Sequence, residues 1–351
     1  TLEHPSRSAP DAVGSPPSCP PSGFVLQRIN TSVFRVPHQV MANMCCMTEH
    51  VRQRLSSQKL PGGRRWVVPR VIPTLEGQPY WQDGQDGCWR ALSFVDNTVT
   101  FDTVQSHQHA WEIGYGLGTF HQLTSDLSPQ LMADTLEGFH ITPHYLAAYH
   151  EALDNRSTTE CPEVLLCRQI IEDRTDRVSV LEDAKQRGDL AIRTIHGDPK
   201  INNILFDVDT QQAVSLIDLD TVKPGLIHYD IGDCLRSGCN QSGEESVDWE
   251  NTTFDVAICE RILKGYYSAA EKTLSVADYE YIYPAVWLIT FELGLRFFTD
   301  FLMDNVYFKQ TYARQNLIRA LVQFELVQSI EQQEQRILAI VQALVRSGSR
   351  S

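Results

Sequence analysis

The stretch Ile195–Thr221, IHGDPKINNILFDVDTQQAVSLIDLDT, decides the fold. It opens with a His-Gly-Asp turn, and Lys200 and Asn203 follow two and five residues after Asp198. Two short apolar runs come next, separated by a polar turn, and the second run ends on Asp218. This pattern predicts a loop followed by a β-hairpin. The hairpin would bring Asn203 and Asp218 close together, with Asp198 on the loop beside them.

The residues at these positions are suited to phosphoryl transfer. Asn203 and Asp218 offer oxygen ligands for a hard cation, and the carboxylate of Asp198 can accept a hydroxyl proton. Protein kinases have the same spacing of His-x-Asp, Lys, Asn and a closing metal-binding Asp. An ordinary β-hairpin with polar turns is the alternative, but it does not explain why these groups lie on one side. Asp220 is a candidate ligand for a second metal ion, or else an ordinary loop residue.

Composition indicates a cytoplasmic globular protein and argues against some classes of partner. The 351 residues carry a net charge of −14, which argues against a nucleic-acid or anionic-membrane surface. The nine cysteines lack zinc-like spacing, so we expect buried, reduced thiols. The most apolar stretch, Tyr281–Phe298, contains Pro284, Glu292 and Arg296 and predicts a buried helix rather than a membrane span.

The chain divides into three predicted regions of unequal size. Residues 1–23 are rich in Pro and Ser and predict a disordered leader. Residues 24–97 predict a small lobe, with a buried strand at 24–30, a helix at 37–60 and strands at 66–72 and 89–95. Residues 98–351 predict a large helical lobe around the central hairpin. Its helices are expected from 106 onward, near 128–138, 143–154, 161–172, 175–187, 253–271 and 277–302, and near 310–346 with a bend at 331–336.

Several further stretches point to one family. They are VLQRINTSVF near the start, a tryptophan-arginine pattern at Trp89–Asn97, FHITP at Phe139–Pro143, and FELGLRFFTDFL with VYFK at Phe291–Lys309. Together with HGDPKINN and IDLDT they resemble N-acetylhexosamine 1-kinases, which are sugar kinases of the aminoglycoside phosphotransferase and choline kinase superfamily. The resemblance covers roughly residues 24 to 325. It implies an α+β, bilobal protein-kinase-like fold with a small, truncated antiparallel-sheet N-lobe and a large, mostly helical C-lobe.

The resemblance also implies an activity. It is the ATP- and Mg²⁺-dependent phosphorylation of the C1 hydroxyl of N-acetylglucosamine or N-acetylgalactosamine, in amino-sugar salvage. Asp198 would be the catalytic base or the group that orients the hydroxyl, and Lys200 would contact the transferring phosphate unless it is a solvated surface residue. Asn203 and Asp218 would hold Mg²⁺ between the phosphates. The expected partners are the nucleotide and the sugar, and a monomer is favoured.

The nucleotide is expected to contact two segments of the small lobe. Arg28 lies on the strand where kinases place a phosphate-contacting lysine, and Glu49 is its natural ion-pair partner. The alternative is that both residues face water. The second segment is the hinge between the lobes, expected at Ser93–Asp96, with Ser93, Phe94 and Val95 as the nucleotide contacts.

The acceptor pocket is expected at three positions of the family, Thr221, Arg296 and Tyr307. Arg296 lies in a nearly all-apolar helix, and a buried unpaired guanidinium is costly. Arg296 should therefore face a polar cavity, or else pair with Glu292 one turn earlier. Weaker candidates, which alternatively only cap a helix, are Phe139, His140 and Thr142.

One departure from the kinase pattern concerns the nucleotide. Kinase lobes begin with a hairpin that covers the ATP phosphates, and the sequence before Phe24 is only the Pro/Ser-rich leader. We therefore expect this hairpin to be lacking, and nucleotide affinity to suffer more than the chemistry at Asp198. Two alternatives stay open. One is a kinase for an aminoglycoside, choline or homoserine, although a cationic acceptor fits poorly with Arg296, and the other is a non-catalytic kinase-like protein.

Overall fold

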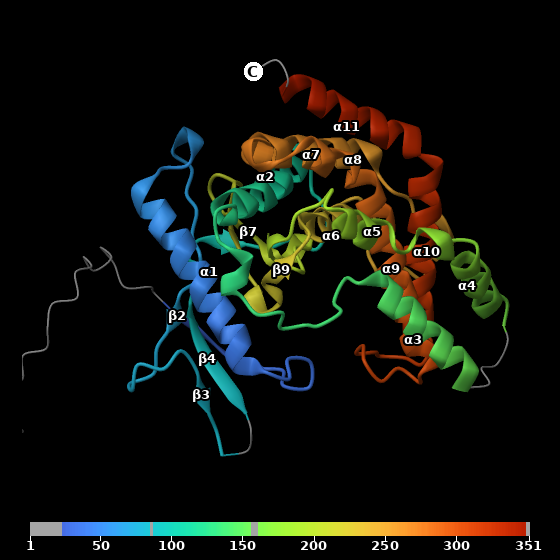
Figure 1. Ribbon diagram of the computed structural model, residues 1–351, viewed down its shortest axis with the longest axis horizontal. Coiled ribbons are helices and arrows are strands. Elements are labelled where there is room, and N and C mark those ends of the chain that lie inside the picture. The colour runs from blue at the N-terminus through green and yellow to red at the C-terminus, as the bar shows by residue number, and fades with distance from the viewer. Residues whose placement is uncertain (1–22, 85–86, 156–160, 349–351) are drawn as a thin grey trace, which may run out of the picture.

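The computed structural model describes residues 23–84, 87–155 and 161–348, which form two parts of unequal size (Figure 1). The smaller, N-terminal part is an antiparallel sheet with one long helix. The larger, C-terminal part is mostly helical and contains two small sheets. This confirms the expected α+β, bilobal protein-kinase-like architecture. Residues 1–22 of the expected leader lie outside the described residues.

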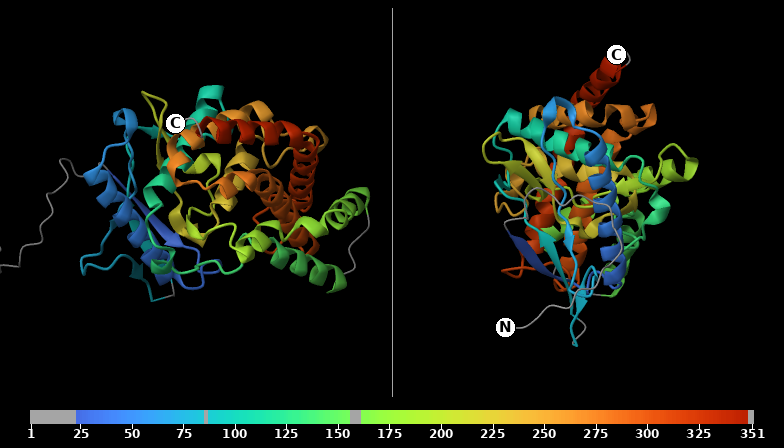
Figure 2. Two further views of the ribbon diagram at one scale, coloured as in Figure 1. Left: turned by 45° about the horizontal axis from the view of Figure 1, so that its top comes forward. Right: turned by 90° about the vertical axis from the view of Figure 1, so that its left-hand side faces the viewer.

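The N-terminal sheet is built around one central strand. Its strands are β1 (Phe24–Ile29), β2 (Val71–Ile72), β3 (Trp81–Gln82) and β4 (Cys88–Ser93), and the other three all pair with β4 in antiparallel fashion. Helix α1 (Pro37–Ser57) lies along this sheet in both views of Figure 2. Its buried face includes Met44, Met47 and Val51, which share one core with Ile29. Proline at the first position suits the start of α1, because the first helical N–H has no partner inside the helix.

The expectation that 24–30 is a buried strand is only partly correct. Strand β1 forms, but Phe24 and Leu26 are 67% and 61% exposed, while Ile29 is buried. The reason is position, because β1 is at the edge of the sheet and pairs with β4 alone among the described strands. The strands expected at 66–72 and 89–95 are found at 71–72 and 88–93.

The two parts meet at the central hairpin. After β4, residues 94–97 lead into β5 (Thr98–Val99), which pairs with β7 (Ile204–Asp207). Strand β7 then pairs with β8 (Ala213–Leu216), as the sequence predicts. A second ribbon joins β6 (Arg193–Ile195) to β9 (Lys223–Gly225) and positions the loop between β6 and β7.

The C-terminal part is assembled around the buried helix α9. The helices are α2 (His107–Thr124), α3 (Thr142–Asn155), α4 (Pro162–Glu172), α5 (Val180–Arg187), α6 (Ile227–Gly238), α7 (Val256–Ala270), α8 (Val276–Glu280), α9 (Ile282–Leu302), α10 (Gln315–Gln332) and α11 (Glu334–Gly348). Helices α3, α6 and α10 pack against α9, while α11 lies on the outside (Figures 1 and 2). Helices α2 and α7 approach so closely that a Cβ on Gly114 would lie 1.8 Å from the Ile262 carbonyl oxygen.

Several helix predictions were wrong or incomplete. Residues 128–138 form only a short 3-10 turn at Pro129–Leu131, followed by a loop that ends with Gly138 at φ 79°. The long helix expected at 310–346 is divided at Gln333, which agrees with the predicted bend. Helix α6 was not predicted. None of the described helices combines the length and apolar content needed to cross a membrane, and all eight described cysteines are free.

Candidate active site

The loop after β6 is held in place by its backbone. Gly197 has φ 86°, and a Cβ there would lie 2.7 Å from the carbonyl oxygen of Thr221, so glycine is required. The backbone N–H groups of His196 and Gly197 donate to the carboxylate of Asp230, at 2.7 and 2.8 Å. Asp230 belongs to α6 and is fully buried. Because Asp198 comes directly after His196 and Gly197, helix α6 fixes the position of Asp198 through these two bonds.

His196 links the loop to the central hairpin. Its ring is fully buried, and Nε2 lies 2.9 Å from the carbonyl oxygen of Ile217 at the end of the hairpin. The hydroxyl of Thr221 donates to the backbone oxygen of His196 at 2.7 Å. These bonds join the loop to the segment after β8.

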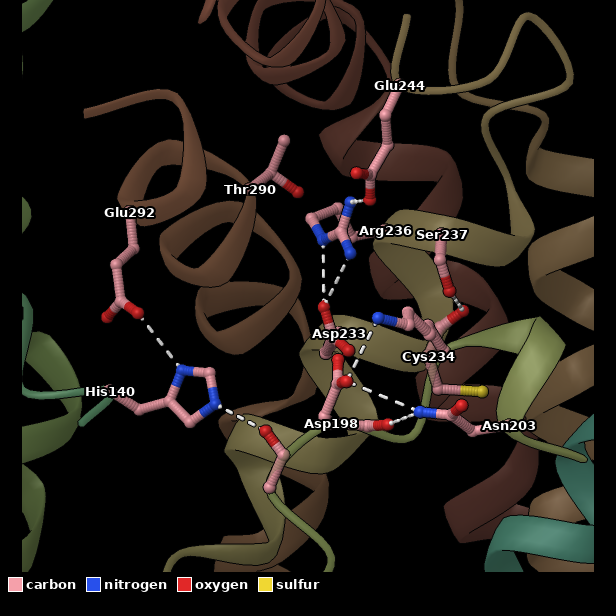
Figure 3. Close-up of polar contacts among 12 residues, drawn as sticks. His140, Asp198, Asn203, Asp233, Cys234, Arg236, Ser237, Glu244, Thr290 and Glu292 are labelled. Atoms are coloured by element: carbon pink, nitrogen blue, oxygen red, sulfur yellow. Dashed lines mark hydrogen bonds and ion pairs between the residues drawn. The ribbon is translucent and has the colours of Figure 1, made fainter. Parts of the chain in front are cut away.

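Asp198 lies at the centre of a set of polar contacts. Lys200 Nζ is 3.0 Å from its Oδ2, and the side-chain nitrogen of Asn203 donates to its backbone oxygen at 2.8 Å and contacts Oδ2 at 3.3 Å (Figure 3). Burial raises the pKa of Asp198, and the nearby carboxylate of Asp233 raises it further, while Lys200 opposes both effects. Asp198 is therefore more basic than an ordinary aspartate, which suits a proton acceptor.

The hairpin brings Asn203 and Asp218 together as predicted. The Ile217 N–H donates to the backbone oxygen of Asn203 at 2.9 Å, so Asp218 follows directly across the ladder, in a left-handed conformation with φ 62°. The amide nitrogen of Asn203 is used by Asp198, which leaves its amide oxygen for a cation. In the part of the chain that the structure describes, no group donates a hydrogen bond to the side-chain carboxylate of Asp218.

This donor set fits Mg²⁺. Magnesium is usually held by one or two protein side chains, with water and substrate phosphates completing its coordination. Within residues 23–84, 87–155 and 161–348, no cluster of three or more His, Cys, Asp or Glu residues able to hold a metal occurs.

Asp220 has a protein partner. It forms an ion pair with Arg90 of β4, and both side chains are largely buried. Arg90 also donates from Nε and Nη2 to the side-chain oxygen of Gln27, at 3.1 and 3.0 Å. The pair links the N-terminal sheet to the central hairpin, and a metal at Asp220 would have to compete with the guanidinium.

The prediction of an ion pair between Arg28 and Glu49 is wrong. Glu49 instead pairs with Arg52, one turn along α1, at 2.7 Å. Arg28 is exposed, because side chains alternate along a strand and it lies on the face opposite to Gln27. The buried cation that faces the hairpin is therefore Arg90, which lies opposite Gln27 in the sheet register.

The expected hinge residues lie between the two parts in three different environments. Ser93 ends β4, and its hydroxyl accepts a hydrogen bond from the Arg70 N–H at 2.9 Å. Phe94 is 51% exposed. Val95 is buried against Leu205 and Val214 of the hairpin.

A cavity of about 360 Å³ opens beside Asp198. The structure brings all three predicted acceptor residues to its wall, together with Phe139 and His140 of the weaker candidates. The charged or polar residues lining it are Asp198, Lys200, Thr221, Asp233, Arg236, Glu244, Glu292, Arg296, Tyr307 and Arg319, with His140. The hydroxyl proton of Thr221 is already donated to His196. Tyr307 is 60% exposed, so it lies at the rim.

Arg296 extends its guanidinium among three aromatic rings, two of which line the cavity. The guanidinium carbon lies 5.2, 5.0 and 5.5 Å from the ring centres of Phe139, Tyr145 and Phe308. Its nearest approach to Glu292 is 3.9 Å, at the limit of an ion pair. Within the described residues the guanidinium has no hydrogen-bond acceptor, which favours the cavity-facing alternative over a helical pair with Glu292.

The carboxylate of Glu292 contacts two residues other than Arg296. Its carboxylate oxygens lie 3.0 Å from His140 Nδ1 and 2.8 Å from the donating hydroxyl of Thr142. His140 Nε2 lies 2.9 Å from the carbonyl oxygen of Gly197, so His140 braces the catalytic loop (Figure 3). Burial alone would lower the pKa of His140, but the Glu292 carboxylate outweighs it and raises the pKa above its ordinary value.

The residues missed by sequence analysis lie mainly on α6. Asp230 and Asp233 are three residues apart and Arg236 follows three later, a spacing that places them on one helical face. Asp233 Oδ1 accepts from Arg236 Nε and Nη2 at 2.9 and 2.7 Å, and Arg236 Nη1 lies 2.6 Å from Glu244 (Figure 3). The spacing of these charged residues was the signal in the sequence that could have identified them. It indicates one shared face only if the segment is a helix, and that helix was not predicted.

The fold and the site define a kinase-like class of protein, with the Asp198 carboxylate beside a hairpin that carries oxygen ligands, between two lobes. Residues 25–260, more than half of the chain, match the model of the phosphotransferase enzyme family. The chain belongs to that family.

Solved structures of similar fold include several small-molecule kinases. An aminoglycoside phosphotransferase from Alicyclobacillus acidocaldarius has a TM-score of 0.56 at 16% identity, over 93% of this chain and 87% of that one. A microcompartment-associated aminopropanol kinase has a TM-score of 0.57 at 16% identity, over 90% and 87%. The amicoumacin kinase hAmiN, solved with AMP-PNP, Ca²⁺ and Ami, has a TM-score of 0.53 at 14% identity, over 88% and 82%. At these identities the likeness establishes the fold.

Proposed function

We propose that this protein is an ATP- and Mg²⁺-dependent kinase that phosphorylates the C1 hydroxyl of an N-acetylhexosamine. The observation that carries the proposal is the cavity itself. Its wall includes the basic carboxylate of Asp198 and the Arg296 guanidinium, which has no hydrogen-bond acceptor among the described residues, and it lies next to the hairpin of Asn203 and Asp218. Such a cavity suits an acceptor that presents one reactive hydroxyl and further oxygen atoms.

In this mechanism the chain positions the acceptor and receives its proton. The acceptor hydroxyl lies against Asp198, which orients it and accepts its proton as the phosphoryl group is transferred. Lys200, held 3.0 Å from Asp198, lies where it can stabilise negative charge on the transferring group. Asn203 and Asp218 would hold Mg²⁺, which when bound neutralises charge on the nucleotide phosphates.

Arg90 is the cation of the N-terminal sheet best placed to meet the phosphates. It is buried and faces the hairpin, whereas Arg28 is exposed on the opposite face of the sheet. Its partner Asp220 lies two residues beyond Asp218, at the end of the same hairpin. In this proposal the guanidinium of Arg90 contacts both Asp220 and a phosphate oxygen of the nucleotide.

The charges around the cavity favour a neutral acceptor. Four acidic side chains and four basic ones line it, so the wall has no excess of negative charge. The similar structures include kinases named for an aminoglycoside and for aminopropanol. A cationic acceptor would be bound better by an acidic, aromatic wall than by one containing Arg296.

The test is ATP consumption with a panel of neutral and cationic acceptors. We expect phosphorylation of N-acetylglucosamine or N-acetylgalactosamine, with the product phosphorylated at C1, and little turnover of choline, ethanolamine or aminoglycosides. Asp198→Asn should abolish turnover without lowering the melting temperature, since the loop is held through its backbone. Turnover of the cationic acceptors alone would refute the sugar assignment, and an active Asp198→Asn variant would refute the base.

A further inference from the structure

Asp233 has one carboxylate oxygen that the described residues leave unused. The residue is 6% exposed and lines the acceptor cavity. Both of its hydrogen bonds, from Arg236 Nε and Nη2, reach Oδ1. Within the described residues, the buried Oδ2 has no hydrogen-bond partner. A buried carboxylate oxygen without a donor is unfavourable, so this atom requires a partner from outside the chain.

The surroundings of Asp233 hold its carboxylate in place. Arg236 is buried and holds it in a fixed orientation, while Glu244 neutralises the other side of the same guanidinium. Two carboxylates around one guanidinium leave one negative charge in excess. That charge lies beside Asp198, as the labelled side chains in Figure 3 show. The free oxygen is therefore a fixed hydrogen-bond acceptor next to the catalytic carboxylate.

We propose that Asp233 Oδ2 accepts a hydrogen bond from the acceptor molecule, from a donor on the carbon next to the one that carries the reacting hydroxyl. The inference rests on the proposed function and deepens it. Because Asp233 and Asp198 lie side by side in one cavity, they contact neighbouring positions of one small acceptor. In an N-acetylhexosamine the donor beside the C1 hydroxyl is the amide N–H on C2. Asp233 then selects acceptors that carry a donor at this position.

Arg296 and Asp233 would form hydrogen bonds with complementary groups of the acceptor molecule. Arg296 supplies donors to acceptor oxygens, whereas Asp233 Oδ2 can only accept. An acceptor that lacks a donor on C2 would leave the charged oxygen without a partner. Discrimination of this kind is large, because a site built to bond a polar hydrogen rejects the analogue that lacks it.

The experiment compares two sugars across matched variants. The wild type, Asp233→Asn and the exposed-site control Asp176→Asn are assayed for the KM of N-acetylglucosamine and for the inhibition constant of 2-deoxyglucose against it. Asparagine keeps an oxygen for Arg236 but can place a donor where the acceptor is needed. Asp233→Glu is included as a second variant that keeps the charge and displaces the oxygen. Melting temperatures establish that each variant is folded.

We expect Asp233→Asn and Asp233→Glu to raise the KM of N-acetylglucosamine by about tenfold or more. The inhibition constant of 2-deoxyglucose should change less than twofold, because this sugar has no donor on C2, and the KM of ATP should not change. Asp176→Asn should alter none of these values. Equal changes for both sugars, or no change for either, would overturn the role of Asp233 while leaving the sugar kinase intact. Failure of the wild type to phosphorylate N-acetylglucosamine would instead refute the proposed function, and this inference with it.

Discussion

Truncation of Arg296 separates binding of the acceptor from packing of the protein. In Arg296→Ala the guanidinium is lost from a cavity wall where it has no protein hydrogen-bond acceptor and only a 3.9 Å approach to Glu292. Glu292 keeps its contacts with His140 and Thr142, so the substitution leaves no orphaned carboxylate. The loss of stability should then be limited to the contacts with aromatic rings, which are worth roughly 1–2 kcal/mol.

The effect on the acceptor should be much larger than the effect on folding. A hydrogen bond from a charged donor contributes about 1.5–3 kcal/mol, which corresponds to a roughly ten- to hundredfold change in affinity. The KM of the sugar should rise by that factor in Arg296→Ala, while the KM of ATP stays nearly constant. Arg296→Lys should recover little, because a single ammonium group cannot reproduce the planar fork of donors.

The assay is steady-state kinetics with each substrate varied in turn, together with thermal unfolding of each variant. Arg174→Ala is the matched control, since Arg174 forks onto Glu331 at 2.6 and 2.9 Å and does not line the cavity. It should lower the melting temperature without changing the KM of the sugar. The reasoning is refuted if Arg296→Ala lowers the melting temperature in the same way and leaves the sugar kinetics flat.

Three further predictions follow from the site. Arg90→Met should raise the KM of ATP at least tenfold while Arg28→Met leaves it unchanged, and nucleotide kinetics that respond equally to both would contradict the assignment of the phosphate cation. Asn203→Ala and Asp218→Ala should both raise the Mg²⁺ concentration needed for half-maximal rate, with Asp218 the more severe because it carries charge, and unchanged Mg²⁺ titrations would rule out the hairpin site. Folding raises the pKa of His140, so the stabilisation that protonated His140 contributes is complete below its unfolded pKa of about 6.5 and is lost as pH rises through its folded pKa. Chemical denaturation across this range should show a falling free energy of unfolding in the wild type. His140→Gln should not show this fall.

The sequence was most informative where residue type and spacing act locally. The hairpin from 204 to 216 was predictable because two apolar runs and a polar turn are sufficient to define it. The placement of Asn203 opposite Ile217, next to Asp218, follows from that hairpin alone. Helix α1 was predictable for a similar reason, since its apolar residues recur at helical spacing after Pro37.

Local pattern failed where tertiary contacts decide the outcome. Helix α6 has apolar residues at helical spacing, Ile227, Ile231, Cys234 and Leu235, but most of its polar residues are buried too, and the burial of Asp230 and Asp233 depends on tertiary packing. The face occupied by Arg28 depends on the register of β1 with β4, which a single strand cannot reveal. The sequences of the two strands therefore do not reveal which of the two arginines, Arg28 or Arg90, is buried against the hairpin.

The catalytic loop is positioned by the same helices that line the acceptor cavity. Its backbone N–H groups are held by Asp230 of α6, one turn before Asp233, and its Gly197 carbonyl is held through His140 by Glu292 of α9. Arg296 lies one turn further along that helix. A displacement of either helix would thus move the base and the acceptor site together. Because phosphoryl transfer depends on alignment to within about 1 Å, the proposed mechanism gives the buried carboxylates of Asp230 and Glu292 the role of positioning Asp198 and the acceptor together.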